Sequence, residues 1–367
     1  MRVGSLVFLL TAASVVTAAA ESSSWVQRAA PEATPAAKPK AAQAAPSKAA
    51  APKASPPAKA AGTSPPSAGK PPAAGGSTPV AGATPSEAAY LAFDAGRFLT
   101  ALKLAEEAAN GGDPAAHTLV GRIYEGAHGV PKDEALAAKW YTRGAELGDI
   151  NAAFAIGLLL AEGRGVDKNP DAAAAMFEQA ARTGHPEANY NLGLMFLHGR
   201  GKPENLIRAA QHIIYAAEQG VAAAQYDASE LYQKGSGVEP DAWEAAHWMK
   251  LAAEQGMAVA EYEYAVLLLR GHGLKQDEFK AIEMMRQAAE KGVAGAQNRL
   301  AHIYREGLGV APDVSEMAKW RLIAKENGIE DDLLDQEVAK LSERDRQAAE
   351  LAASTWADRA QVRALVP

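Results

Sequence analysis

The stretch that decides the fold is residues 112–148, which read GDPAAHTLVGRIYEGAHGVPKDEALAAKWYTRGAELG. The glycine at its start recurs every 36 residues, with no insertion or deletion, at Gly148, Gly184, Gly220, Gly256, Gly292 and Gly328. A fixed period of this length indicates a repeat protein, in which each unit buries its apolar face against its neighbours. The sequence therefore predicts six stacked units.

Small residues at two fixed distances from each glycine indicate close contacts between helices. Four residues after the glycine stands an alanine in every unit: Ala116, Ala152, Ala188, Ala224, Ala260 and Ala296. Nine residues after it stands another small residue: Gly121, Gly157, Gly193, Ser229, Ala265 and Ala301. In the third unit, the spacing of Ala188, Leu192 and Phe196 is that of one helical face, so we predict a first helix from Pro186 to His198.

A turn and a second helix complete each unit. The turn contains a G-x-G pair in five of the six units, which provides positions for positive φ, whereas Ala127 replaces the first glycine in the first unit. The second helix begins after residues that favour N-caps: Asp133, Asn169, Asn205, Asp241, Asp277 and Asp313. Asp241/Glu244 and Asp313/Glu316 have the spacing of capping boxes. Seven residues after each cap we expect a core side chain: Trp140, Met176, His212, Trp248, Met284 and Trp320.

At these residues the chain resembles the Sel-one-like repeat family, a relative of the tetratricopeptide repeat with a longer turn between its helices. The first unit carries the family pattern at Gly121, Tyr124, Gly129, Val130, Trp140, Tyr141 and Gly148. The resemblance covers residues 113–328. It implies an all-α fold, an α-solenoid of helix-turn-helix repeats wound into a right-handed superhelix. Lys202 departs from the pattern, which has valine there.

Shorter segments flank the six repeats and are expected to cap them. Residues 86–112 are predicted to form an N-terminal pair of helices, closer to an ordinary tetratricopeptide unit. Residues 329–367 are predicted to form C-terminal capping helices, one from Glu330 to Ala339 and one from Ser342 to about Ala364. Ser342 and Asp345 have the spacing of a cap pair.

The N-terminal part of the chain has a different composition. Residues 1–20 combine Arg2, an apolar stretch from Leu6 to Val16 and small residues at Ala18 and Ala20, which predicts a signal peptide cleaved after Ala20. The alternative is an uncleaved inner-membrane anchor with an exported repeat domain. Residues 21–85 are rich in Ala, Pro and Lys and hold 13 of the 21 prolines, so we predict a disordered linker.

Charge and missing motifs narrow the range of functions. Residues 21–85 carry seven Lys/Arg against two Glu, a net +5, and Arg2 adds one, which leaves −13 for residues 86–367 out of the total of −7. An acidic repeat domain argues against nucleic-acid binding, while the basic linker suits contact with an anionic cell-wall polymer or membrane surface. The chain has no cysteine, and no catalytic, metal or cofactor motif apart from an S-x-x-K spacing at Ser67–Lys70, inside the predicted linker. We therefore expect no enzyme activity, no cofactor and no metal.

The predicted binding surface comes from the first helices, which line the concave side of the superhelix in the tetratricopeptide superfamily. This groove should be apolar in the second and third repeats, acidic in the fourth and fifth, and basic in the sixth. The residues expected to line it are Phe154, Leu158, Tyr190, Asn191, Leu194, Tyr226, Asp227, Glu230, Tyr262, Glu263, Arg299 and Arg305. The alternative is that the aromatic residues only pack between adjacent repeats.

These observations predict a non-enzymatic interaction scaffold, an adaptor or regulator of the bacterial envelope that binds a protein or peptide partner in its groove. The expected location is the periplasm or another exported compartment. The alternative function is binding or hydrolysis of cell-wall fragments or β-lactams, which is implied by cysteine-rich relatives with the same fold. Those relatives carry disulfides in each repeat, whereas this chain has no cysteine.

Overall fold

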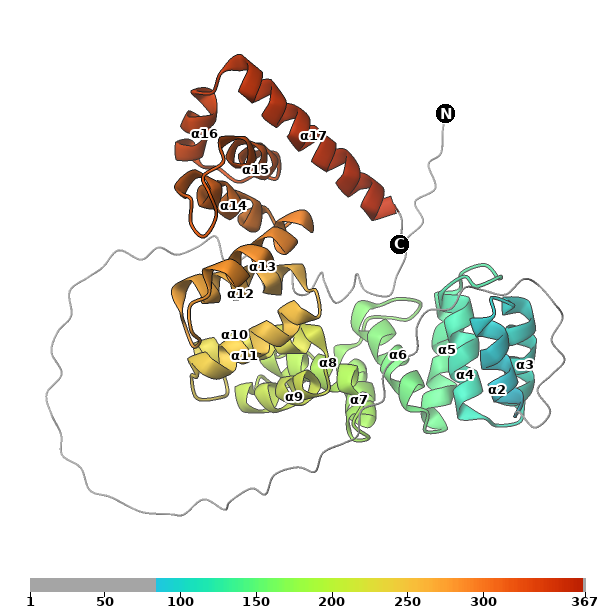
Figure 1. Cartoon of the computed structure of the whole chain (residues 1–367). Coiled ribbons are helices and arrows are strands. Elements are labelled where there is room, and N and C mark those ends of the chain that lie inside the picture. Colours follow the sequence, from blue (N-terminus) through green and yellow to red (C-terminus); the bar gives the residue numbers. More distant parts are fainter. Residues whose placement is uncertain (1–83, 366–367) are drawn as a thin grey trace, which may run out of the picture. The chain divides into compact units, whose positions relative to one another are not determined.

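A computed structural model describes residues 84–365, and every element in this range is a helix (Figure 1). The helices are α2 (Pro85–Asp94), α3 (Phe98–Asn110), α4 (Pro114–Glu125), α5 (Glu134–Glu146), α6 (Ile150–Glu162), α7 (Pro170–Ala181), α8 (Pro186–His198), α9 (Leu206–Glu218), α10 (Ala222–Lys234), α11 (Ala242–Glu254), α12 (Ala258–Arg270), α13 (Glu278–Glu290), α14 (Ala294–Glu306), α15 (Val314–Glu326), α16 (Asp332–Ala339) and α17 (Glu343–Leu365). The predicted signal peptide and almost all of the predicted linker lie outside the described residues.

The helices pack as successive antiparallel pairs in chain order, which confirms the solenoid (Figure 1). Each unit contributes one pair, from α4 with α5 to α14 with α15, and the second helix of each unit also packs against the first helix of the next. The first helix of the third unit spans Pro186–His198, as the spacing of its apolar residues predicts. A short pair, α2 with α3, precedes the six units.

The second helices begin where the sequence predicts, because each predicted cap residue accepts a hydrogen bond from a backbone N–H of the first turn. The six N-caps are Asp133, Asn169, Asn205, Asp241, Asp277 and Asp313. The capping box predicted at Asp313/Glu316 is only half formed. Glu316 donates its backbone N–H to Asp313, but its carboxylate accepts hydrogen bonds from Lys319 and Trp320.

The turn between the two helices depends on left-handed backbone conformations. In the second to sixth units the first helix ends at a glycine with φ between 63° and 79°. The first unit has alanine at this position, and Ala127 adopts φ 55°, the one positive φ of a non-glycine residue between 84 and 365. A Cβ clashes with the backbone in this region, so the first turn carries a strain that the other five avoid.

The most buried position of each second helix is the eighth residue after its N-cap, not the seventh as predicted. The eighth residues are all at most 1% exposed: Tyr141, Phe177, Ile213, Met249, Met285 and Arg321. Of the seventh residues, Trp248 and Trp320 are buried, whereas the other four are only half-buried: Trp140, Met176, His212 and Met284. The eighth residue is central because its side chain points at the small residue of the first helix.

The fit between these two positions is tight in the first three units. A Cβ added to Gly121 would lie 2.5 Å from Cε1 of Tyr141, and a Cβ added to Gly157 would lie 2.7 Å from Cε1 of Phe177. In the later units Ser229 and Ala265 replace glycine, and the facing residue becomes a methionine. The flexible methionine side chain adapts to the larger neighbour, so the two positions vary together.

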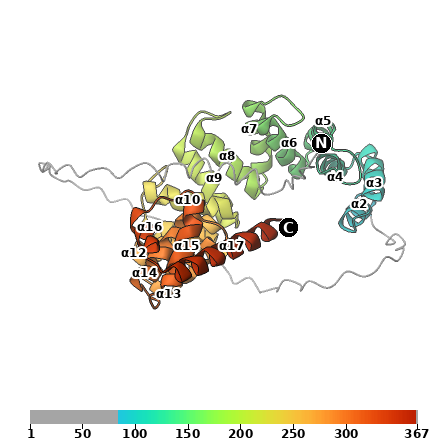
Figure 2. The ribbon, with the colours of Figure 1, turned by 90° about the horizontal axis from the view of Figure 1, so that it is seen from above.

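Helices α16 and α17 close the C-terminal end of the solenoid (Figure 2). Arg321 occupies the core position of the sixth unit, where its Nε donates to Oδ1 of Asp335 on α16 at 2.7 Å and its Nη1 donates to Oδ1 of Asn298 at 3.1 Å. Helix α17 lies beside α15, with the rings of Trp320 and Trp356 packed edge to face at 6.1 Å. The last unit therefore ends in an ion pair between the buried Arg321 and the half-buried Asp335.

Candidate functional site

The first helices α4, α6, α8, α10, α12 and α14 carry the predicted groove residues. The sixth residue after each glycine contacts the following unit. The ring of Phe154 stacks on His185 with centroids 4.6 Å apart, and the hydroxyl of Tyr190 donates to Oδ2 of Asp227 at 2.9 Å. At the C-terminal end, Asn298 donates to Asp331 at 2.9 Å. These residues therefore join neighbouring repeats.

The aromatic residues differ in how much of the ring reaches solvent. Tyr190 is only 4% exposed, so its side chain belongs to the packing between the third and fourth units. Phe154, Tyr226 and Tyr262 are half-buried and pack with one side against the core. Among residues 84–365, neither Tyr226 nor Tyr262 uses its hydroxyl in a hydrogen bond. These two hydroxyls are available to a ligand.

Acidic side chains lie beside the two tyrosines. Burial raises the pKa of Asp227 to about 6, although the hydrogen bond from Tyr190 lowers it. Burial and the nearby carboxylate of Glu230 also raise the pKa of Glu263, which has no ion-pair partner within the described part of the chain. Glu230 forms an ion pair with Lys234 on the same helix. The fourth and fifth units thus hold negative charge that the protein only partly neutralises.

The residues at the two ends of the predicted groove differ in burial and in their polar contacts. Leu158 and Leu194 are half-buried in the apolar half. The amide of Asn191 donates to the backbone carbonyl of Glu187, one turn earlier, at 2.8 Å. In the sixth unit Arg299 is exposed, whereas Arg305 is half-buried and pairs with Glu306. Arg299 is therefore the freer of the two cations.

A set of hydrogen-bonded pairs within single units, called polar clasps below, was not predicted from the sequence. The fifth residue after the glycine is buried and polar in five of the six units, and in the fourth, fifth and sixth units it bonds the last residue of its own unit. Nε2 of Gln255 donates to Oε1 of Gln225 at 2.7 Å, and Nζ of Lys291 donates to Oε1 of Glu261 at 2.6 Å. Asn327 donates to Gln297 in the same way at 2.8 Å. Polar residues recurring at a buried helical position were the signal for this set.

A row of exposed apolar residues was also missed. The second residue after the N-cap is Ile207, Trp243 and Phe279 in the third, fourth and fifth units, and these side chains are 61–79% exposed. The same position holds Ala135, Asp171 and Ser315 in the other units. The row therefore follows the repeat period over three consecutive second helices.

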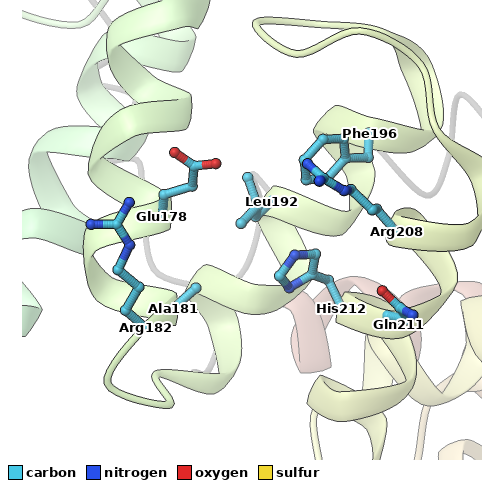
Figure 3. Close-up of a pocket in the computed structure, with 8 residues that line it drawn as sticks. All are labelled: Glu178, Ala181, Arg182, Leu192, Phe196, Arg208, Gln211 and His212. Atoms are coloured by element: carbon cyan, nitrogen blue, oxygen red, sulfur yellow. The ribbon is translucent and has the colours of Figure 1, made fainter.

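A cavity of about 260 Å³ lies between the second and third units (Figure 3). Helix α7 contributes Glu178 and Ala181, and Arg182 is its C-cap residue, while α8 and α9 contribute the other walls: Leu192, Phe196, Arg208, Gln211 and His212. His212, which the sequence predicts as a core side chain, is half-buried in the wall of this cavity. Within residues 84–365 no group of His, Asp and Glu is arranged to hold a metal ion, and no helix there is long and apolar enough to cross a membrane.

The helix pairs, the 36-residue period and the contacts between units define a repeat solenoid of the helix-turn-helix class. The Sel1 repeat model matches six consecutive segments, residues 114–149, 150–185, 186–221, 222–257, 258–293 and 294–320. The chain therefore belongs to the Sel1 repeat family. Sel1 repeats are generally protein–protein interaction modules and typically act as non-catalytic scaffolds.

The solved structure of a Sel1 repeat protein agrees with this assignment. A Sel1 repeat protein from Oxalobacter formigenes is 28% identical and covers 68% of this chain and 100% of its own, with a TM-score of 0.59. A protective antigen of uropathogenic Escherichia coli with an SLR fold is 24% identical over 72% of this chain and 73% of its own, with a TM-score of 0.34. No curated protein matches the chain.

Proposed function

We propose that this protein is a non-enzymatic scaffold that binds an extended segment of a partner protein along its first helices. The single observation that carries the proposal is the pair Tyr226 and Tyr262, whose rings are supported by the core and whose hydroxyls are unused. Tyrosine combines a large contact area with few rotors and a polar end, so it contributes strongly to protein interfaces. Glu263 adds a carboxylate with no ion-pair partner in the described structure.

The charge of this surface favours a partner segment with a basic side chain. Asp227, Glu230 and Glu263 lie on α10 and α12 next to the two tyrosines, and the carboxylate of Glu230 raises the pKa of both Asp227 and Glu263. A lysine or arginine entering here would relieve the repulsion among the carboxylates. Such binding should weaken with added salt, because the attraction between partly exposed charges is screened.

The experiment compares two double variants in affinity capture from envelope extracts. Tyr226→Ala/Tyr262→Ala removes the two rings, and Glu230→Gln/Glu263→Gln removes charge at constant shape. Tyr190 stays unchanged, because its loss would disturb the packing between units. Both variants should lose the partner recovered by the wild-type protein while keeping its helical circular dichroism.

Tyr304→Ala provides the matched control. Tyr304 lies twelve residues after its glycine, and its hydroxyl accepts hydrogen bonds from Arg286 on the second helix, away from the proposed surface. This variant should capture the partner as the wild type does. Equal recovery by all variants would rule out the first-helix surface as the binding site.

We further propose that the scaffold works outside the cytoplasm, after cleavage behind Ala20. The apolar stretch from Leu6 to Val16, followed by Ala18 and Ala20, supports this location. N-terminal sequencing of the protein purified from a periplasmic fraction should begin at Glu21. A protein that begins at Met1 and sediments with membranes would favour the anchored alternative.

A further inference from the structure

We propose that the cavity between the second and third units binds a carboxylate attached to an aromatic or bulky aliphatic group. The cavity holds about 260 Å³ and is lined by α7, α8 and α9 (Figure 3). Leu192 and Phe196 lie on α8 eight and twelve residues after Gly184, whereas the proposed partner surface uses the sixth, seventh and tenth residues. The cavity is therefore a separate site.

The cavity exists because a smaller residue stands where other units have tryptophan. His212 is the seventh residue after its N-cap, the position of Trp140, Trp248 and Trp320. Trp248 and Trp320 are buried there, so an indole fills the corresponding space in their own units. The imidazole of His212 leaves part of that volume empty. The third unit thus has a smaller ring at this position than the units that hold tryptophan.

The wall of the cavity that His212 and Phe196 form is fixed before any ligand enters, whereas Arg182 and Arg208 are exposed. Nδ1 of His212 lies 2.9 Å from Oδ1 of Asn189, and the imidazole stacks on the ring of Phe196 with an angle of 4° between the planes. The Asn189 amide donates to the backbone carbonyls of Ala181 and His185, so Oδ1 is the acceptor and the histidine carries its proton on Nδ1. A rigid wall reduces the entropy lost on binding.

Two arginines make the cavity attractive to an anion. Arg182 and Arg208 form no ion pair with any residue that the structure describes, although the guanidinium of Arg208 lies over the ring of Phe196 at 5.5 Å. The one carboxylate in the wall, Glu178, is already paired with Lys202 at 3.0 Å. Burial lowers the pKa of His212, so this residue stays neutral near pH 7. The two guanidinium groups therefore supply an unbalanced positive charge.

The chemistry of the walls selects the ligand class. Leu192, Phe196 and Ala181 form an apolar floor, and a guanidinium group pairs with a carboxylate through two parallel hydrogen bonds. The volume is below the usual range for drug-sized ligands, so it suits one ring or one side chain. A free aromatic acid and the C-terminal phenylalanine or leucine of a protein chain share this chemistry.

Isothermal titration calorimetry with the full chain tests the proposal. The probes are 3-phenylpropionate and an acetylated tetrapeptide that ends in phenylalanine, each compared with its uncharged amide. Both acids should bind the wild type at least about tenfold more tightly than their amides, because the charge-assisted hydrogen bonds are lost with the carboxylate. A peptide that binds at least about tenfold more tightly than 3-phenylpropionate identifies a protein C-terminus as the source, and equal affinity identifies a free acid.

Two variants locate the site. Arg182→Gln/Arg208→Gln should weaken binding of the acids at least about tenfold. His212→Trp restores the residue of the first, fourth and sixth units and should abolish binding by filling the space, with a Tm no lower than that of the wild type. Arg143→Gln removes an exposed arginine of the first unit and should bind as the wild type does.

Three results would overturn the proposal. The first is that neither acid binds the wild type, and the second is that acid and amide bind equally. The third is that His212→Trp binds as well as the wild type while remaining folded. The outcome is independent of the partner surface, because Tyr226→Ala/Tyr262→Ala should leave binding of both acids unchanged.

Discussion

The hydroxyl of Tyr190 donates to Oδ2 of Asp227 at 2.9 Å, and this bond joins the first helices of the third and fourth units. The bond connects a packing residue, Tyr190, with an acidic residue of the proposed binding surface, Asp227. Tyr190 is buried, whereas Asp227 shares its environment with Glu230 and the half-buried Tyr226. The acidic surface of the fourth unit is therefore anchored to the third unit.

The burial of Asp227 predicts an unusual dependence of stability on pH, although the hydrogen bond from Tyr190 opposes it. Burial raises the pKa of Asp227 to about 6 in the folded protein, above the value of about 3.9 expected in the unfolded chain. The folded state thus binds the proton more tightly, so the contribution is full below about pH 4 and is lost as pH rises through about 6. The loss should reach about 3 kcal/mol. Urea unfolding between pH 4 and pH 7 measures it.

Asp227→Asn is the matched control for this titration. The amide oxygen can still accept the Tyr190 hydroxyl, but the side chain has no proton to release. The difference in unfolding free energy between wild type and variant should therefore change across pH 4–6. A constant difference across this range would contradict the assignment.

The contact between Gly121 and Tyr141 predicts a pair of substitutions that compensate each other. Gly121→Ala places a Cβ 2.5 Å from the buried ring and should destabilise the protein by about 1–3 kcal/mol. Adding Tyr141→Met reproduces the pairing of Ala265 with Met285 in the fifth unit and should recover part of this loss. Unfolding free energies of the two single variants and the double variant measure the coupling. Additive effects would show that the two positions do not depend on each other.

The strained turn of the first unit predicts a stabilising substitution. Ala127 adopts φ 55° where the five other units have glycine, so Ala127→Gly should raise the free energy of unfolding by about 0.5–1 kcal/mol. Ala95→Gly is the control, because Ala95 has φ −79° and gains nothing from glycine. That variant should lose stability by a similar amount. Thermal and urea unfolding should rank the two variants on opposite sides of the wild type.

The ion pair between Arg321 and Asp335 predicts that replacing one member destabilises the protein more than replacing the other. Asp335→Ala removes the carboxylate from an arginine side chain that is 1% exposed, and should cost about 2–4 kcal/mol. Arg321→Met introduces the residue of the fourth and fifth units and should cost less than about 1 kcal/mol, since a well-packed apolar residue can replace a buried ion pair. The two unfolding curves decide this. A larger loss for Arg321→Met would mean that the ion pair itself stabilises the C-terminal end.

The fold could be predicted closely because its signals are local and repeated six times. The N-caps, the turn glycines and the helix from Pro186 to His198 depend on residues close in sequence. The prediction failed by one position at the core, where the seventh residue was chosen over the eighth. The size of Trp140 favoured it as the core residue. Burial depends instead on which side chain faces Gly121, and this is a tertiary contact made by Tyr141.

The candidate site was less predictable for the same reason. Tyr190 and Tyr226 occupy equivalent positions in the sequence. Only the structure shows that Tyr190 is a packing residue, because its hydroxyl bonds Asp227 of the next unit. Whether these residues bind a partner stays a prediction. The cavity at His212 could not be foreseen, because a missing volume becomes visible only when its neighbours Arg182 and Phe196 are placed around it.

The polar clasps have a consequence for how the array could lengthen or shorten. Each clasp joins two residues of one unit, as Glu261 and Lys291 do within residues 256–291, so a duplicated block with these limits carries its own partners. A duplication of 270–305 would instead set the second copy of Lys291 against Gln297. Gene rearrangements that begin at the glycine would keep the two residues of each clasp matched, and those that begin between them would not. A duplication that begins at the glycine can thus add a repeat without separating the two residues of a clasp.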